Sequence, residues 1–181
     1  MKRVLLSFII MVGGGQAVAN DPQEYLYKVP PGTRLVLQQP VTIPLGTATV
    51  YFQGGGVVGE DDVDEYYPHC ALLSRVVGVV PQTIPAGTFT ITRVFPFEEE
   101  HNTSSRMLRH YAGSRSGFIT VGLGVASAET TYYFATRLLL QADAIPDIMY
   151  LECRQMTEYD IGDHLRISEF KQAVGSLMSL R

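Results

Sequence analysis

Short apolar runs separated by turn residues make up most of the chain after residue 30. These runs are rich in β-branched and aromatic residues, which is typical of strands. Consecutive runs are not separated by amphipathic segments of helix length, which argues against a parallel α/β sheet. We therefore predict an all-β protein, an antiparallel β-sandwich, with a small β-barrel as the alternative. The predicted strands cover residues 34–38, 47–53, 70–80, 89–95, 118–121, 130–141 and 148–155.

A motif of the form [Val/Ile]-Pro-x-Gly-Thr occurs at residues 29–33, 43–47 and 84–88. Proline holds φ at about −65°, and a glycine two residues later accepts positive φ, so the motif favours a turn. The residues that follow each copy are β-formers. We interpret the copies as turns that lead into strands. A ligand-binding role and an origin by duplication are the alternatives.

The C-terminal segment has a different period. We predict a short helix with Ser168 as its N-cap and Glu169 in its first turn, interrupted or ended by Gly175. A short strand at 164–167 and a last extended piece at 177–180 flank this helix. The apolar face of the helix has spacing i, i+4, i+7 and consists of Phe170, Val174 and Leu177.

The N-terminus has the pattern of a bacterial-type signal peptide. Lys2 and Arg3 give a positive start, an apolar run covers residues 4–12, and Ala17-Val18-Ala19 is a cleavage motif. The run is too short to cross a bilayer, which needs about 20 apolar residues. We expect residues 1–19 to be removed, an uncleaved anchor being the alternative. Residues 20–181 would then form one β-rich domain without a transmembrane segment, in the periplasm or outside the cell.

The two cysteines, Cys70 and Cys153, are predicted to form a disulfide, because an exported chain meets an oxidising compartment. Two unpaired thiols, one of them reactive, are the alternative. Neither cysteine lies in a C-x-x-C motif, so a redox role is not indicated. The enclosed loop is long, and the chain-entropy model gives a stabilisation of roughly 4 kcal/mol as an upper figure.

An acidic run at residues 59–65 precedes two tyrosines and a histidine. Clustered carboxylates outside the cytoplasm can bind calcium, but the spacing does not match an EF-hand. A solvated acidic loop is the simpler interpretation, and no metal site is predicted. The candidate binding residues in this region are Asp61, Asp62, Asp64, Glu65, Tyr66, Tyr67 and His69.

A second candidate is a long polar loop at about residues 98–117. Loops of this length in a compact domain are usually functional or disordered. We expect either a partner-recognition loop or an insertion between strands. Its candidate binding residues are His101, Arg106, Arg109, His110 and Arg115.

Charge excludes some classes of partner. Loss of Lys2 and Arg3 leaves 12 basic against 18 acidic residues, so the mature chain has no electrostatic footprint for nucleic acid. It also has no polybasic segment for anionic lipid. Zinc-ligand spacings, nucleophile elbows, Walker loops and complete dinucleotide fingerprints are absent from the sequence, so no cofactor is predicted.

These features favour binding over catalysis. We predict a non-catalytic binding or cell-envelope assembly role, with another envelope or secreted protein as the partner. One alternative is a β-barrel that binds a small apolar ligand, since tyrosine and phenylalanine are abundant. The other is a hydrolase that uses His69, His101 or His110 with a carboxylate from residues 61–65, which requires these groups to meet in one cleft.

Overall fold

The fold is that of a computed structural model, which describes residues 21–102, 130–142, 145, 147–158 and 162–181. Over these residues it is antiparallel β, with one short α-helix and two 3-10 helices, η2 (Leu26–Lys28) and η3 (Glu60–Asp62). The α-helix is α2 (Ile167–Val174). The strands are β1 (Arg34–Leu37), β2 (Val41–Ile43), β3 (Thr49–Gln53), β4 (Gly56–Val58), β5 (His69–Ser74), β6 (Gln82–Ile84), β7 (Gly87–Asn102), β8 (Thr130–Gln141), β9 (Ile148–Glu158) and β10 (Met178–Leu180).

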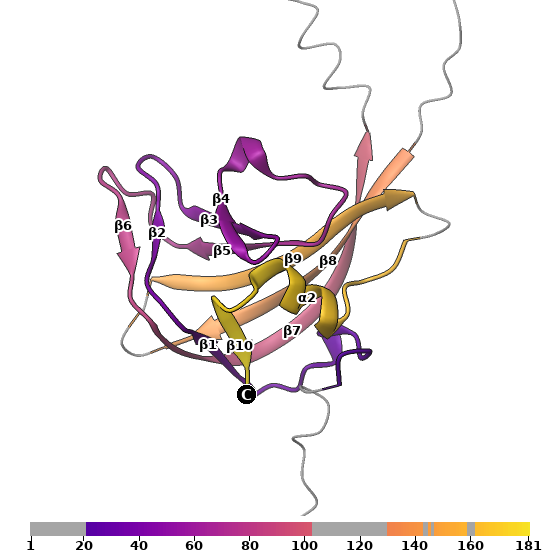
Figure 1. The fold of residues 1–181 in the computed structure, drawn as a ribbon, viewed down its shortest axis with the longest axis horizontal. Coiled ribbons are helices and arrows are strands. Elements are labelled where there is room, and N and C mark those ends of the chain that lie inside the picture. Colours follow the sequence, from indigo (N-terminus) through magenta and orange to yellow (C-terminus); the bar gives the residue numbers. More distant parts are fainter. Residues whose placement is uncertain (1–20, 103–129, 143–144, 146, 159–161) are drawn as a thin grey trace, which may run out of the picture.

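Eight strands form one curled sheet in the order β10-β1-β7-β8-β9-β5-β3-β4, and β2 pairs with β6 in a separate two-stranded sheet (Figure 1). The curled sheet has β10 and β4 at its two ends. This arrangement confirms the predicted all-β antiparallel class with a C-terminal helix. It is consistent with the predicted sandwich and also with half of a barrel, whereas the alternative expected from the sequence was a small β-barrel.

The core lies on the face of the sheet that α2 covers. Helix α2 packs against β3 and β5 and buries Phe170, Ala173 and Val174 completely. The sheet contributes alternate residues, as the two-residue period of a strand requires. Fully buried examples are Phe52, Leu72, Leu138 and Leu151.

Cys70 and Cys153 form the predicted disulfide, with an S–S distance of 2.06 Å. They are direct partners in the β5–β9 ladder and are completely buried. The bond therefore joins neighbouring strands whose cysteines are 83 residues apart in sequence.

The longest strands are β7 and β8. The predicted strand 130–141 has the same bounds as β8. The predicted strand 89–95 is too short, because β7 continues past Pro96 to Asn102. Residues 98–102 therefore belong to a strand that pairs with β8, and placing them in a polar loop was wrong. The remainder of that predicted loop, 103–117, and the predicted strand 118–121 lie outside the described residues.

The strand predicted at 70–80 was too long, because β5 ends at Ser74. The valines that follow belong to a loop and are exposed. An apolar run shows which residues gain from burial, but not whether other elements cover them. Gly78 and Pro81, within and just after the run, favour a loop.

The helix was predicted in the right place with the wrong cap. Helix α2 begins at Ile167, Arg166 is its N-cap, and the Arg166 backbone N–H donates to Glu169 (2.7 Å). The strand predicted at 164–167 is reduced to a single bridge between Arg166 and Tyr25. Gly175 ends the helix, and β10 lies within the extended piece predicted at 177–180.

The three Pro-x-Gly-Thr motifs differ in structure. Gly32 and Gly46 have positive φ, as a turn requires, but Gly87 opens strand β7 instead. Residues 41–43 pair with residues 82–84, so the second and third copies begin on neighbouring antiparallel strands, β2 and β6.

Candidate functional site

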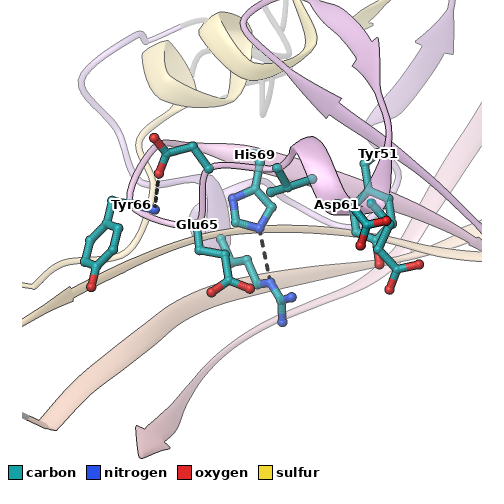
Figure 2. A pocket seen from close by; sticks show the side chains of 9 residues that line it. Tyr51, Asp61, Glu65, Tyr66 and His69 are labelled. Atoms are coloured by element: carbon teal, nitrogen blue, oxygen red, sulfur yellow. Dashed lines mark hydrogen bonds between the residues drawn. The ribbon is translucent and has the colours of Figure 1, made fainter. Parts of the chain in front are cut away.

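The candidate site lies on the face of the sheet opposite the core, where the segment 60–66 passes over β3, β5 and β9. It is a pocket of about 680 Å³. Figure 2 shows Tyr66 and Glu65 at one end, Asp61 and Tyr51 at the other, and His69 between them. The residues that line it are Tyr51, Glu60, Asp61, Val63, Asp64, Glu65, Tyr66, His69 and Arg154.

Hydrogen bonds hold the acidic segment onto the sheet. The Gln53 side chain donates to the carbonyl of Asp64 (2.7 Å) and accepts from its N–H (2.9 Å). The backbone N–H of Met156 donates to the carbonyl of Glu65 (2.7 Å). The Asp64 carboxylate accepts from the N–H of Tyr66 (3.1 Å). Because strands on two sides fix this backbone, the pocket is formed before a ligand arrives.

His69 forms the floor of the pocket with 1% of its surface exposed. Its Nδ1 is 3.0 Å from the carbonyl oxygen of Tyr67, which can only accept, and its Nε2 is 3.3 Å from Nε of Arg154, which can only donate. Taken together, the two bonds require a neutral imidazole that carries its proton on Nδ1 and leaves Nε2 free to accept. Burial lowers the pKa of His69 below its ordinary value of 6.5; the Tyr67 hydrogen bond opposes this, and Arg154 adds to it.

Arg154 belongs to a line of charged side chains that crosses the sheet. Its Nη1 is 3.6 Å from Glu152, which accepts two hydrogen bonds from Arg137 (2.9 and 2.6 Å). The Arg154 guanidinium stacks 4.4 Å from the ring centroid of Tyr133. That of Arg137 stacks 4.3 Å from Tyr150. These contacts hold Arg154 at the pocket wall and leave its charge already partnered.

The pocket therefore carries a negative charge excess. Four carboxylates line it, from Glu60, Asp61, Asp64 and Glu65, against the single guanidinium of Arg154. Tyr51 stays protonated, because burial raises its pKa and the neighbouring Glu60 carboxylate raises it further. Carboxylates together with tyrosine faces are suited to a cationic group.

The geometry is less suited to the hydrolase hypothesis. His69 does share one cleft with the carboxylates of residues 61–65, as that hypothesis requires. Both of its ring nitrogens, however, already form hydrogen bonds to the protein. A general base needs a free nitrogen within reach of the substrate proton.

The structure brings together five of the sequence candidates, Asp61, Asp64, Glu65, Tyr66 and His69. Asp62 is exposed in η3 but does not line the pocket, and Tyr67 contributes only its carbonyl to the His69 bond. His101 lies on β7 in register with Thr131. The other candidates, Arg106, Arg109, His110 and Arg115, lie outside the described residues.

Sequence reasoning missed Tyr51 and Arg154. The sequence does carry a signal for Arg154. Arg154 comes directly after Cys153, and His69 comes directly before Cys70. If a disulfide joins two antiparallel strands at facing positions, the residue before one cysteine faces the residue after the other. The observed register pairs His69 with Arg154 in this way.

Two searches of the described residues gave negative results. Within residues 21–102, 130–142, 145, 147–158 and 162–181, no three His, Cys, Asp or Glu side chains are grouped as metal ligands. In the same part of the chain, no helix has the length and hydropathy needed to span a bilayer.

Comparison with known proteins gave no relative: no family model, curated protein or solved structure matches the chain.

Proposed function

We propose that this is an exported binding protein that captures a cationic side chain, a lysine or arginine of an envelope or secreted protein, in the acidic pocket. The observation that carries the proposal is the lining of that pocket. Four carboxylates and two tyrosines, Tyr51 and Tyr66, surround a space whose one guanidinium is already bound within the protein.

Two physical features support a binding role. Asp64 is held by the Gln53 side chain on β3, and Glu65 is held by the Met156 backbone N–H on β9, so little conformational entropy is lost in this part of the segment when a ligand enters. A partly enclosed site also screens charges less than open solvent does, so each ion pair formed there is stronger than at a flat surface.

Export is supported by two features of different kinds. The leader pattern at residues 1–19 predicts secretion. The buried disulfide, which contains both cysteines of the chain, fits an oxidising compartment.

The test compares Asp61→Asn with Asp62→Asn. Both remove one charge from η3, but only Asp61 lines the pocket. The probe is a tri-lysine peptide, titrated against the protein and followed by NMR chemical shifts. We expect the affinity to fall about threefold to tenfold in Asp61→Asn, to change little in Asp62→Asn, and to decline with added salt.

A tri-lysine peptide acetylated at its side chains serves as the ligand control, because it has lost those charges. Equal binding of the acetylated and free peptides would contradict capture of a cation. Equal weakening by the two substitutions would indicate a diffuse acidic surface rather than this pocket. Peptide hydrolysis that is abolished by His69→Gln would replace the binding proposal with an enzymatic one.

A further inference from the structure

Two adjoining loops form an apolar tip at the end of the molecule that carries β2 and β6 (Figure 1). The tip consists of residues 44–46 and 76–80. Its loops are joined by a hydrogen bond from the Gly46 N–H to the Gly78 carbonyl (3.0 Å). Its aliphatic side chains are largely exposed: Val79 89%, Val80 62%, Val77 60%, Leu45 59% and Val76 47%.

Exposure of this kind is unusual for a folded chain. Single exposed apolar residues are common, but a contiguous apolar patch marks a surface that meets a protein or a membrane. Five of the eight large exposed apolar side chains among the described residues lie in this tip. The exposed apolar side chains are therefore clustered in the tip and not scattered over the surface.

The sequence around the tip lacks charge. Residues 35–59 and 76–92 contain no Asp, Glu, Lys or Arg, and the charged residue nearest to the tip in sequence is Arg75. Nothing charged would need to lose water if the tip entered an apolar medium. Charged side chains are the most costly groups to move into hydrocarbon.

Part of the loop backbone is also satisfied internally. The N–H of Val76 donates to Ser74 Oγ (3.2 Å), and the carbonyl of Val76 accepts from the Gln82 side chain (3.2 Å). The carbonyl of Gly78 accepts from Gly46, as described above. Unpaired backbone groups are a main cost of entering a bilayer, so these bonds lower that cost.

We propose that the tip inserts into the hydrocarbon edge of a lipid bilayer and holds the protein at a membrane surface. A second copy of the chain fits the tip less well, because five aliphatic side chains fall far short of the roughly 800 Å² per partner of a stable interface. The tip also lacks the tyrosine, tryptophan and arginine that anchor protein interfaces. The proposal does not depend on the acidic pocket.

The absence of tryptophan from the chain gives a direct test. Val79→Trp places a single indole at the most exposed position of the tip, and Tyr67→Trp places one at a residue that is 60% exposed outside it. Each purified protein is mixed with phosphatidylcholine vesicles. We expect the emission of Val79→Trp to move to shorter wavelength and to be quenched by brominated lipid, and that of Tyr67→Trp to stay unchanged.

A second pair of variants tests the same surface without adding an aromatic ring. Val79→Glu and Gln172→Glu each add one carboxylate at an exposed position, the first in the tip and the second on α2. Co-sedimentation with vesicles should weaken at least about tenfold for Val79→Glu, because a charge must be dehydrated, and remain unchanged for Gln172→Glu.

Binding to lipid should be insensitive to salt and to added phosphatidylglycerol, because it comes from apolar burial rather than charge. Three outcomes would overturn the proposal: no blue shift for Val79→Trp, equal shifts for the two tryptophan variants, or binding that requires anionic lipid. A shift that appears without vesicles and grows with protein concentration would assign the tip to self-association instead.

Discussion

His69 is the residue whose protonation state controls the pocket most directly, because its Nε2 accepts the hydrogen bond from Arg154 only in the neutral form. Since the folded protein lowers the pKa of His69 below 6.5, the unfolded chain takes up this proton at a higher pH. The stabilisation is therefore complete above pH 6.5 and declines as the pH falls below it. Each unit of pKa depression corresponds to about 1.4 kcal/mol.

We expect the free energy of unfolding, measured by urea denaturation, to decrease from about pH 7 to about pH 5. His69→Gln keeps a donor and an acceptor but does not titrate, so its decrease over this range should be smaller. A variant that follows the same pH dependence as the unmodified protein would show that carboxylates, not His69, cause the change.

Arg137 and Glu152 form a close ion pair (2.6 Å) whose side chains are 31% and 10% exposed. Arg137→Met leaves the Glu152 carboxylate with the more distant Arg154, at 3.6 Å. We expect a loss of about 2 kcal/mol in the free energy of unfolding, below the 3–5 kcal/mol of a fully buried pair because Arg137 is partly exposed. Urea denaturation followed by circular dichroism measures this loss.

A double-mutant cycle separates the ion pair from the stacking of Arg137 on Tyr150. Arg137→Met is measured in the unmodified protein and in the Glu152→Gln variant. If it lowers the free energy of unfolding equally in both, the charge interaction contributes nothing and the stacking accounts for the loss. Arg137→Lys should give an intermediate value, because lysine keeps the charge but not the planar pair of donors.

At the scale of elements, the end of α2 is docked on the β3–β4 turn through glycine. The N–H of Gly55 donates to the carbonyl of Ala173 (3.0 Å). Gly175 has φ +54°, and a Cβ built on it would lie 2.6 Å from the Cα of Gly55. Gly175→Ala should therefore cost the strain of positive φ, about 1–2 kcal/mol, and a packing clash of about 1–3 kcal/mol.

Gly32→Ala is the matched control for this substitution. Gly32 also has positive φ, at +93°, but a Cβ there would meet nothing within 4 Å. It should show the strain alone, so the difference between the variants in thermal or urea unfolding measures the contact of α2 with the turn. Equal losses for the two substitutions would indicate that the backbone of Gly55 moves aside without cost.

The element predictions succeeded where local pattern and tertiary burial agree, as in the 130–141 strand and the apolar face of α2. The predicted strand 89–95 is shorter than β7, because a proline such as Pro96 favours the end of a strand. Beyond Thr90, however, the described ladder pairs β7 with β8 and no longer with β1. A proline fits such a strand, because a backbone nitrogen that faces the open side needs no partner.

The candidate site was predictable in part. The acidic run and His69 could be selected from the sequence because they are close together in it. Tyr51 and Arg154 are distant in sequence and reach the pocket only through the order of β3, β5 and β9 in the sheet. Apart from the disulfide, the sequence carries no direct signal of that order.

At the scale of the whole molecule, export and the disulfide make one joint prediction about the covalent state of the protein. If residues 1–19 are a signal peptide, protein purified from the exporting cell will have a mass that corresponds to a chain beginning at Asn20. Because Cys70 and Cys153 are bonded and are the chain's only cysteines, alkylation should add mass only after reduction. Intact mass spectrometry with and without reduction measures both.

The two halves of this prediction can fail separately, and each failure has a different consequence. An uncleaved leader with an intact disulfide would replace the free exported form with an anchored one, and the apolar tip would then act beside an existing membrane attachment.

Free thiols in the unreduced protein would remove up to about 4 kcal/mol of expected stabilisation. The β5–β9 ladder would then have to keep His69 beside Arg154 by hydrogen bonding and packing alone. Since the pocket depends on that register, the apparent affinity for the lysine peptide should fall on reduction by the fraction of molecules that lose the register. Binding that is unchanged after reduction would show that the sheet alone maintains the site.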